Sequence, residues 1–201
     1  MEVFIPIDML IRANRIKYRY LVWPGIVIVI NFILSITYPS LFTKYVSILA
    51  LVFYFLILFI FRFKRNYPKY ETDVVVSPIN GKIVHIKTLD EGYVVSIKKP
   101  FFASCEFVTC TRNDFPKVLI TEKPQVSWKI ESQHKYIFID ETVEYQAVLV
   151  GIVPGTALCE VFIPNIYKIN AVEGSVLEAG FSELGVKIEN YENEAIVDIS
   201  D

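Results

Sequence analysis

Few side chains in this sequence combine in a pattern that supports catalysis or metal binding. The chain has two histidines, His85 and His134, and three cysteines, Cys105, Cys110 and Cys159. An activated nucleophile needs a base beside it, and a zinc site needs Cys or His ligands at short, regular spacing. Neither histidine has a Cys or His at that spacing, so we expect no metal site. We interpret both histidines as surface or strand positions, and the cysteines as reduced, packed thiols.

Two short segments carry residues whose chemistry depends on a turn. In the first, Ser77-Pro78-Ile79-Asn80-Gly81 lies between two β-branched runs. Asn-Gly tolerates the positive φ values of a tight turn, so the sequence predicts a β-hairpin there, with Lys82 directly after the turn. The second segment is Gly174-Ser175, the only Gly-Ser pair in the chain. We interpret this pair as plain turn chemistry.

The elements that must position these residues are short strands. After residue 72 the sequence consists of β-branched and aromatic runs separated by Gly, Pro and Asn, without a sustained helical period. This pattern predicts a mainly β domain over residues 73–201. Gly174, Gly180 and Gly185 indicate successive tight turns, and with the opening turn they resemble the barrel-sandwich hybrid of biotinyl and lipoyl carrier domains. Lys82 lacks the acidic or Met neighbours of the modified lysine in those carriers, so we do not expect it to be modified.

The N-terminal third of the chain is strongly apolar, and 53% of all 201 residues are hydrophobic. Residues 21–37 and 45–61 form two almost uninterrupted apolar runs, each close to the roughly 20 residues needed to cross a bilayer. Their connection is short, so the two spans must form a hairpin. The first run is too long and too far from Met1 to be a cleaved signal peptide. We predict a basic N-terminus over residues 1–20, a transmembrane helical hairpin over 21–62 and a basic linker over 63–72.

Charge is divided unevenly between the two parts. Residues 1–69 carry nine Lys and Arg against two acidic residues, a net charge of +7, whereas the rest of the chain carries −9. Basic residues lie before and after the hairpin, and only Lys44 lies near its connection. The positive-inside rule then places both termini and the β domain in the cytoplasm, in a multi-pass protein of the cytoplasmic membrane. The basic collar suits a phospholipid membrane as partner, and the acidic domain disfavours nucleic acid.

The order of these features resembles one enzyme family. A hydrophobic hairpin, then Phe61-Arg62, a polar linker and Ser77-Pro78-x-x-Gly81-Lys82-Ile83 are similar to the short, membrane-anchored branch of the phosphatidylserine decarboxylase family. The similarity extends to residues 94–112, 146–153 and 172–185. It implies a family fold in which the chain cuts itself at a Gly-Ser bond, and the serine becomes a pyruvoyl group that accepts electrons during decarboxylation. In the family an Asp of the turn orients a His, which activates the serine.

This chain departs from the family at each of those positions. The Asp corresponds to Asn80, whose amide carries no charge. The His corresponds to Thr109 or a neighbour, and no Gly-Ser occurs in residues 186–198. We therefore expect no catalytic residues, no self-cleavage and no cofactor. A pyruvoyl group is expected only if the processing site has been rearranged.

Three functions follow from these patterns. The first is a non-catalytic, membrane-anchored relative of the decarboxylase that acts at the cytoplasmic face in phospholipid-related binding or scaffolding. The second is an active decarboxylase that makes phosphatidylethanolamine with a divergent processing site, and the third is a membrane-tethered adaptor of the biotinyl or lipoyl type. The sequence names neither the lipid nor an oligomeric state.

The segment Lys98-Lys99-Pro100-Phe101-Phe102 is the clearest candidate for lipid contact under the first function. Its lysines would meet headgroups while its phenylalanines enter the interface; the alternative is that both phenylalanines pack in the core. The lipid-interface candidates are Arg62, Lys64, Arg65, Lys98, Lys99, Phe101 and Phe102.

Overall fold

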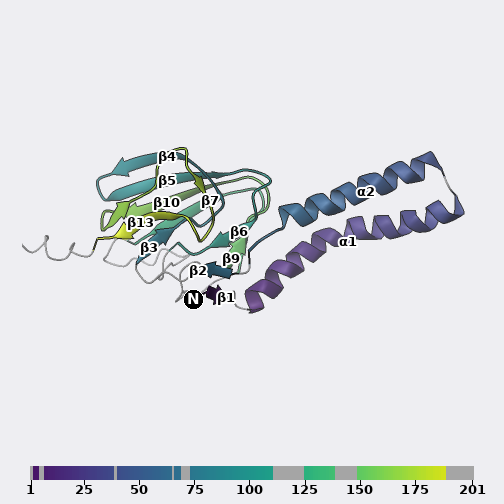
Figure 1. Ribbon diagram of the computed structural model, residues 1–201, viewed down its shortest axis with the longest axis horizontal. Helices are drawn as coiled ribbons and strands as arrows, with labels where there is room; N and C mark the ends of the chain where they lie inside the picture. Colours follow the sequence, from purple (N-terminus) through teal and green to yellow (C-terminus); the bar gives the residue numbers. More distant parts are fainter. Residues whose placement is uncertain are drawn as a thin grey trace, which may run out of the picture.

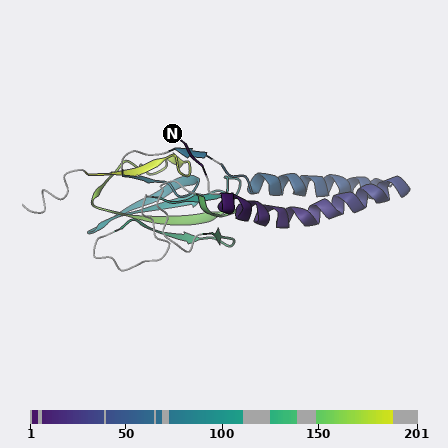
Figure 2. The ribbon, with the colours of Figure 1, turned by 90° about the horizontal axis from the view of Figure 1, so that it is seen from below.

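Two long helices form an antiparallel hairpin that projects from one end of a β region (Figures 1 and 2). The computed structural model describes residues 2–4, 7–38, 40–64, 66–68, 73–110, 125–138 and 149–188. Helix α1 covers Ile7–Thr37 and α2 covers Leu41–Ile60. At 1.5 Å per residue they are about 46 Å and about 30 Å long. Both are long and apolar enough to cross a membrane, judged by length and composition.

The hairpin is held by a cap and by a polar contact between the helices. Ser40 caps α2, because its side chain accepts from the Thr43 amide and the Thr43 hydroxyl lies within reach of the Ser40 amide. The buried amide of Asn31 in α1 donates to the Thr43 carbonyl and to the Ser47 hydroxyl of α2. Polar side chains bond in this way between helices surrounded by lipid. Most of the other hairpin side chains are apolar and exposed.

Helix α1 begins at Ile7, although a helix was expected only from residue 21. Its first turns extend past the end of α2 and pack on the β region. Ala13 is fully buried in a cluster with Val76 and Ile152, and the Arg12 side chain donates to the Phe138 carbonyl over 2.9 Å. From residue 7 on, the predicted basic N-terminus is therefore a helical part of the junction.

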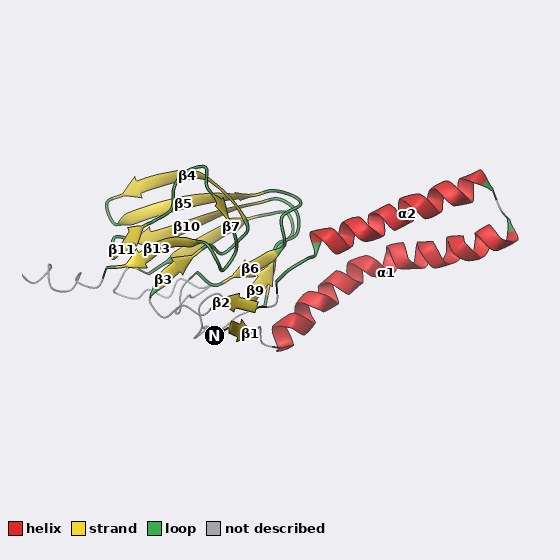
Figure 3. Ribbon diagram, in the orientation of Figure 1, coloured by secondary structure: helices red, strands yellow, loops and turns green. Residues whose placement is uncertain are grey.

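The region after the hairpin is a set of antiparallel strands, drawn yellow in Figure 3. The largest sheet is a curled half-barrel with the order β12-β4-β5-β10-β7. Its strands are β12 (Val176–Leu177), β4 (Gly81–Leu89), β5 (Gly92–Lys99), β10 (Ala157–Pro164) and β7 (Ser127–Glu131). A second sheet consists of β11 (Tyr167–Ile169), β13 (Glu183–Lys187) and β3 (Val74–Val76). A third consists of β6 (Glu106–Val108), β9 (Leu149–Ile152) and β8 (Tyr136–Ile137), and a small pair joins β1 (Glu2–Phe4) to β2 (Asn66–Pro68).

The core lies on the concave side of the half-barrel and follows the alternation of its strands. Along β10, the side chains of Cys159, Val161 and Ile163 are fully buried, while Leu158, Glu160 and Phe162 are partly exposed. The Phe107 ring meets the Trp128 ring edge to face, with centroids 4.6 Å apart. The prediction of a membrane-length helical hairpin followed by a mainly β region is confirmed at this level.

The hairpin predicted at Asn80-Gly81 is wrong. Strands β3 and β4 do not pair with each other, because β3 pairs with β13 and β4 pairs with β5 and β12. Gly81 lies inside β4 without a positive φ. A Cβ there would lie 2.6 Å from the Lys98 carbonyl oxygen, so this glycine serves close strand approach and not a turn. The segment before it crosses from one sheet to another.

Candidate functional site

The turn after β5 lies at the end of the β region that is nearest to the helical hairpin. It consists of residues 100–103, closed by the Ala103 amide, which donates to the Pro100 carbonyl over 3.1 Å. Phe101 and Phe102 are 44% and 55% exposed, and their rings meet edge to face at 5.1 Å. The alternative that both phenylalanines pack in the core is therefore wrong. We call residues 100–103 the aromatic turn.

The aromatic turn is joined to the end of α2. The Phe102 ring lies 6.1 Å from the Phe59 ring, and the Arg62 guanidinium donates to the Phe102 carbonyl over 3.3 Å. The same guanidinium lies over the Phe59 ring, 4.1 Å from its centroid. In addition, the Cys105 amide donates to the Arg62 carbonyl over 2.9 Å. Arg62, Phe59 and Phe102 thus lie together where the hairpin ends.

Lys99 is buried, which differs from its expected place at lipid headgroups. Alternation along β5 turns Lys98 outward and Lys99 inward. The Lys99 ammonium donates to the Ala103 carbonyl over 3.0 Å and to the Gly155 carbonyl over 2.7 Å. A Cβ placed on Gly155 would lie 3.6 Å from the Phe101 ring, so the two loops are neighbours, and the ammonium links them. Lys99 therefore holds the aromatic turn in place from inside.

Two ionisable groups accompany Lys99 behind the turn. Burial lowers the pKa of Lys99, an effect opposed by Cys105 and Glu106 and assisted by Arg62. Burial, and then the charge of Glu106, raises the pKa of the Cys105 thiol to about 12. Glu106 is fully buried and accepts from the Ser104 hydroxyl over 3.0 Å. Within the described residues its second carboxylate oxygen has no hydrogen-bond partner.

The remaining interface candidates lie in different surroundings. Lys64 is exposed, forms an ion pair with Glu178 and lies over the Phe181 ring, 4.2 Å from its centroid. Lys98 is exposed on β5, in register with Lys82 of β4. Arg65 lies outside the described residues. The structure thus brings Arg62, Phe101 and Phe102 together and leaves Lys98 apart from them.

Asn80 and Thr109, which the resemblance noted in the sequence aligns with an Asp and a His, lie in adjacent segments. An isolated bridge pairs Ile79 with Phe107, which places both positions within a few residues of the same contact. The Asn80 amide oxygen accepts from the Ala179 amide over 3.1 Å, and its nitrogen lies 3.5 Å from the Ser104 carbonyl. Thr109 is buried. Asn80 therefore acts as a structural hydrogen-bonding group in this fold.

The structure also joins residues that no sequence pattern connects. His85 Nδ1 lies 3.0 Å from a carboxylate oxygen of Glu173, and the same oxygen accepts from the Ile86 amide over 2.7 Å. Glu173 directly precedes the Gly174-Ser175 pair, and Gly174 has a φ of +84°. The Ser175 hydroxyl donates to the Val172 carbonyl over 2.7 Å. His134 is exposed in the loop before β8, remote in sequence from this group.

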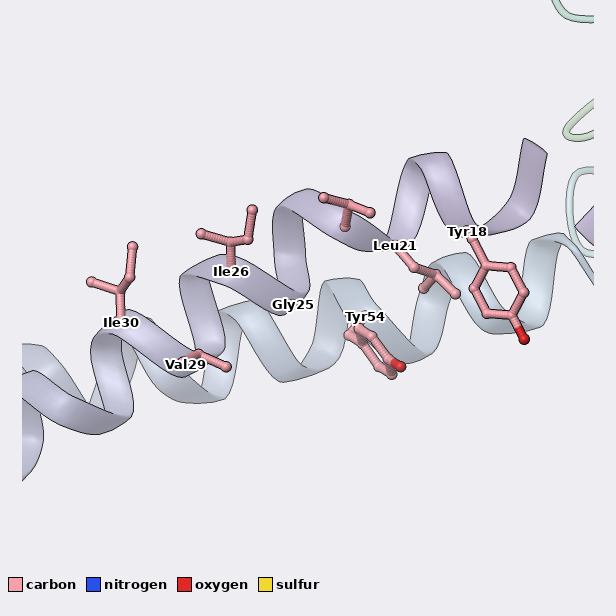
Figure 4. Close-up of a pocket in the computed structure, with 8 residues that line it drawn as sticks. Tyr18, Leu21, Gly25, Ile26, Val29, Ile30 and Tyr54 are labelled. Carbon is pink, nitrogen blue, oxygen red and sulfur yellow. The ribbon is translucent and has the colours of Figure 1, made fainter. Parts of the chain in front are cut away.

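An apolar groove runs along the hairpin (Figure 4). It has a volume of about 510 Å³, and seven residues of α1 and Tyr54 of α2 line it. At its centre nothing lies within 4 Å of a Cβ placed on Gly25. The lining residues are Tyr18, Leu21, Val22, Gly25, Ile26, Val29, Ile30 and Tyr54. The helical spacing of these α1 residues is visible in the sequence, but the contribution of α2 is not.

Comparison with known proteins gives no relative. The chain matches no family model, no curated protein and no solved structure. In the part of the chain that the structure describes, no three His, Cys, Asp or Glu residues gather as metal ligands.

Proposed function

We propose that this is a membrane-anchored protein whose β domain lies on the cytoplasmic surface of the membrane and acts there in phospholipid binding or scaffolding. The hairpin supplies the anchor, and the positive-inside rule supplies the orientation. Arg12, Arg15 and Arg19 of α1 are exposed at the same end as Arg62. That end also carries the β domain (Figure 1).

The observation that carries the proposal is the exposed aromatic turn at the end of α2. Two adjacent exposed phenylalanines are costly in water, whereas at a bilayer surface they add apolar burial. Arg62 lies beside them as a cation that lipid phosphates would meet, and Lys99 fixes the turn from inside. The turn is therefore placed to enter the interface without a change in the fold.

A depth measurement tests this placement on the full chain in bilayer nanodiscs. A nitroxide on Phe102→Cys should be more accessible to oxygen than to a water-soluble nickel chelate, measured by power-saturation spectroscopy. Thr88→Cys, at the far end of β4, provides the control in water. The three native cysteines are buried, so they leave the label site-specific. Equal accessibility at both positions would refute the proposed docking.

We further propose that the chain is a non-catalytic relative of the phosphatidylserine decarboxylase family, with a β domain of the barrel-sandwich type. Asn80 bonds to backbone groups and cannot stabilise an imidazolium, and the segment 102–112 contains no histidine. The intact mass of the chain purified from its own host should equal that of one uncut polypeptide. Two fragments, the smaller one blocked by pyruvoyl, would contradict this reading.

One arrangement favours the active decarboxylase as second candidate. The chain's only Gly-Ser bond follows Glu173, and that carboxylate bonds to His85. A base that bonds to a carboxylate is one part of the pattern that nucleophilic chemistry requires, and the serine follows that carboxylate by two residues. The Ser175 hydroxyl is, however, directed to the Val172 carbonyl. Cleavage after Gly174, absent in His85→Gln, is the mass result that would favour this candidate.

A further inference from the structure

We propose that the groove at Gly25 binds one acyl chain of an anionic phospholipid, whose phosphate lies between Arg15 and Arg19. The inference rests on the proposed membrane location and adds a lipid class and a site to it. The lining of the groove is apolar, and it is built almost entirely from one face of α1. No part of it belongs to the aromatic turn.

The length of the groove matches one leaflet of a bilayer. From Tyr18 to Ile30 the helix rises by about 18 Å. Half of a hydrocarbon core of about 30 Å is about 15 Å. Tyr18 lies at the end nearest the β domain and Ile30 at the far end (Figure 4). A chain in the groove would therefore lie in the leaflet next to the β domain.

The positive charge at the end of the groove nearest the β domain selects an anionic headgroup. Arg15, Tyr18, Arg19 and Val22 are spaced by three and four residues, so they share one face of α1. Arg15 and Arg19 are both exposed. This face thus presents two guanidinium groups and a phenol, followed by an apolar channel. An anionic headgroup with an acyl chain has the complementary order of charge and apolar surface.

Glycine is what opens the channel. A side chain at position 25 would extend into unoccupied space, because nothing lies within 4 Å of its Cβ. Gly25→Leu therefore fills the groove without a clash, and it replaces a poor helix former by a good one. Val27→Leu enlarges an exposed side chain of α1 that does not line the groove, and serves as matched control.

Native mass spectrometry of the full chain, released from nanodiscs of equal phosphatidylglycerol and phosphatidylcholine, measures the retained lipid. We expect wild type and Val27→Leu to retain phosphatidylglycerol in preference. Gly25→Leu should retain about tenfold less, equivalent to 1.4 kcal/mol. Val29→Phe is a second filling variant, used if Gly25→Leu does not fold. Unchanged retention in a folded filling variant overturns the proposal, and so does wild type without lipid preference.

The charge variants test the headgroup separately. Arg15→Gln and Arg19→Gln should each lower the preference for phosphatidylglycerol about fivefold, as expected for one basic group near the surface. Lys17→Gln removes the same charge from a residue off this face and should change little. A two-chain mass that Gly25→Leu abolishes would show a second helix in the groove and overturn the proposal. Failure of the Phe102→Cys depth test with intact lipid selectivity would refute only the docking of the β domain.

Discussion

Replacing Lys99 by Met should loosen the aromatic turn while preserving most of the side-chain volume. The ammonium donates two hydrogen bonds, to the Ala103 and Gly155 carbonyls, and hydrogen bonds of charged groups contribute about 1.5–3 kcal/mol each. The burial that lowers the pKa of Lys99 offsets part of this gain. We expect a net loss of about 1–3 kcal/mol in the free energy of unfolding. Lys98→Met, on the exposed side of the same strand, should change it by less than about 0.5 kcal/mol.

Urea unfolding in micelles of the full chain carrying Trp23→Phe, followed by the fluorescence of the remaining Trp128, measures this difference. Trp128 packs on Phe107 in the β core, so its emission reports the β region. Equal costs for Lys99→Met and Lys98→Met would refute the bracing role. If Lys99→Met lowers the free energy of unfolding but leaves the depth of the Phe102→Cys label unchanged, the ammonium supports the core and not the turn.

The difference between wild type and Lys99→Met should also depend on pH. The pKa of Lys99 is lowered from 10.5 in the folded protein. At pH values between this lowered pKa and 10.5, the unfolded chain therefore binds more protons than the folded chain. Stability of wild type relative to Lys99→Met should therefore rise with pH in this alkaline window. The neutral amine keeps two N–H groups, enough for both carbonyls. A relative stability that falls toward pH 10.5 would contradict the assigned direction of the shift.

Gly81→Ala should destabilise the fold by about 1–3 kcal/mol, since its Cβ would meet the Lys98 carbonyl at 2.6 Å, whereas Gly25→Ala should not destabilise it. Thermal unfolding of both variants checks this contrast, and equal behaviour would refute the role of close strand approach. Burial raises the pKa of Cys105 and of Cys159, so neither thiol should react with iodoacetamide at pH 8 until urea unfolds the chain. Rapid labelling of native protein at either cysteine would contradict this expectation.

The two parts of the chain could be predicted because each has a strong periodic signal. Uninterrupted apolar runs leave few choices besides membrane-length helices, and alternating β-branched runs leave few besides strands. The same alternation could have shown that Lys98 and Lys99 face opposite sides of β5. This local signal contradicts the interpretation of both lysines as headgroup ligands, because only one of two adjacent residues in a strand faces outward.

The errors at Asn80-Gly81 and the missed contacts at Glu173 have a common cause. A turn signal describes only the preference of a few residues, and pairing of β4 with β5 overrides it. His85 and Glu173 are far apart in the chain, and only the pairing of β12 with the start of β4 brings them together. Likewise, Tyr54 reaches the groove only because α2 folds back on α1. Such long-range contacts depend on strand order and helix register, which one sequence does not specify.

The junction between the hairpin and the β region determines where the aromatic turn lies relative to the helices. Arg12 and Tyr20 of α1 bond to Phe138 and Tyr136, and Arg62, just after α2, bonds to the aromatic turn, so three hydrogen bonds reach two separate segments of the β region. A buried apolar cluster that includes Ala13, Ile60 and Val76 fills the space between them. A domain held in this way cannot rotate freely on a linker, because rotation would break buried contacts as well as surface bonds. The position of the aromatic turn relative to the helices is therefore fixed, and under the proposed docking a change that shifts α1 in the bilayer should move the turn with it.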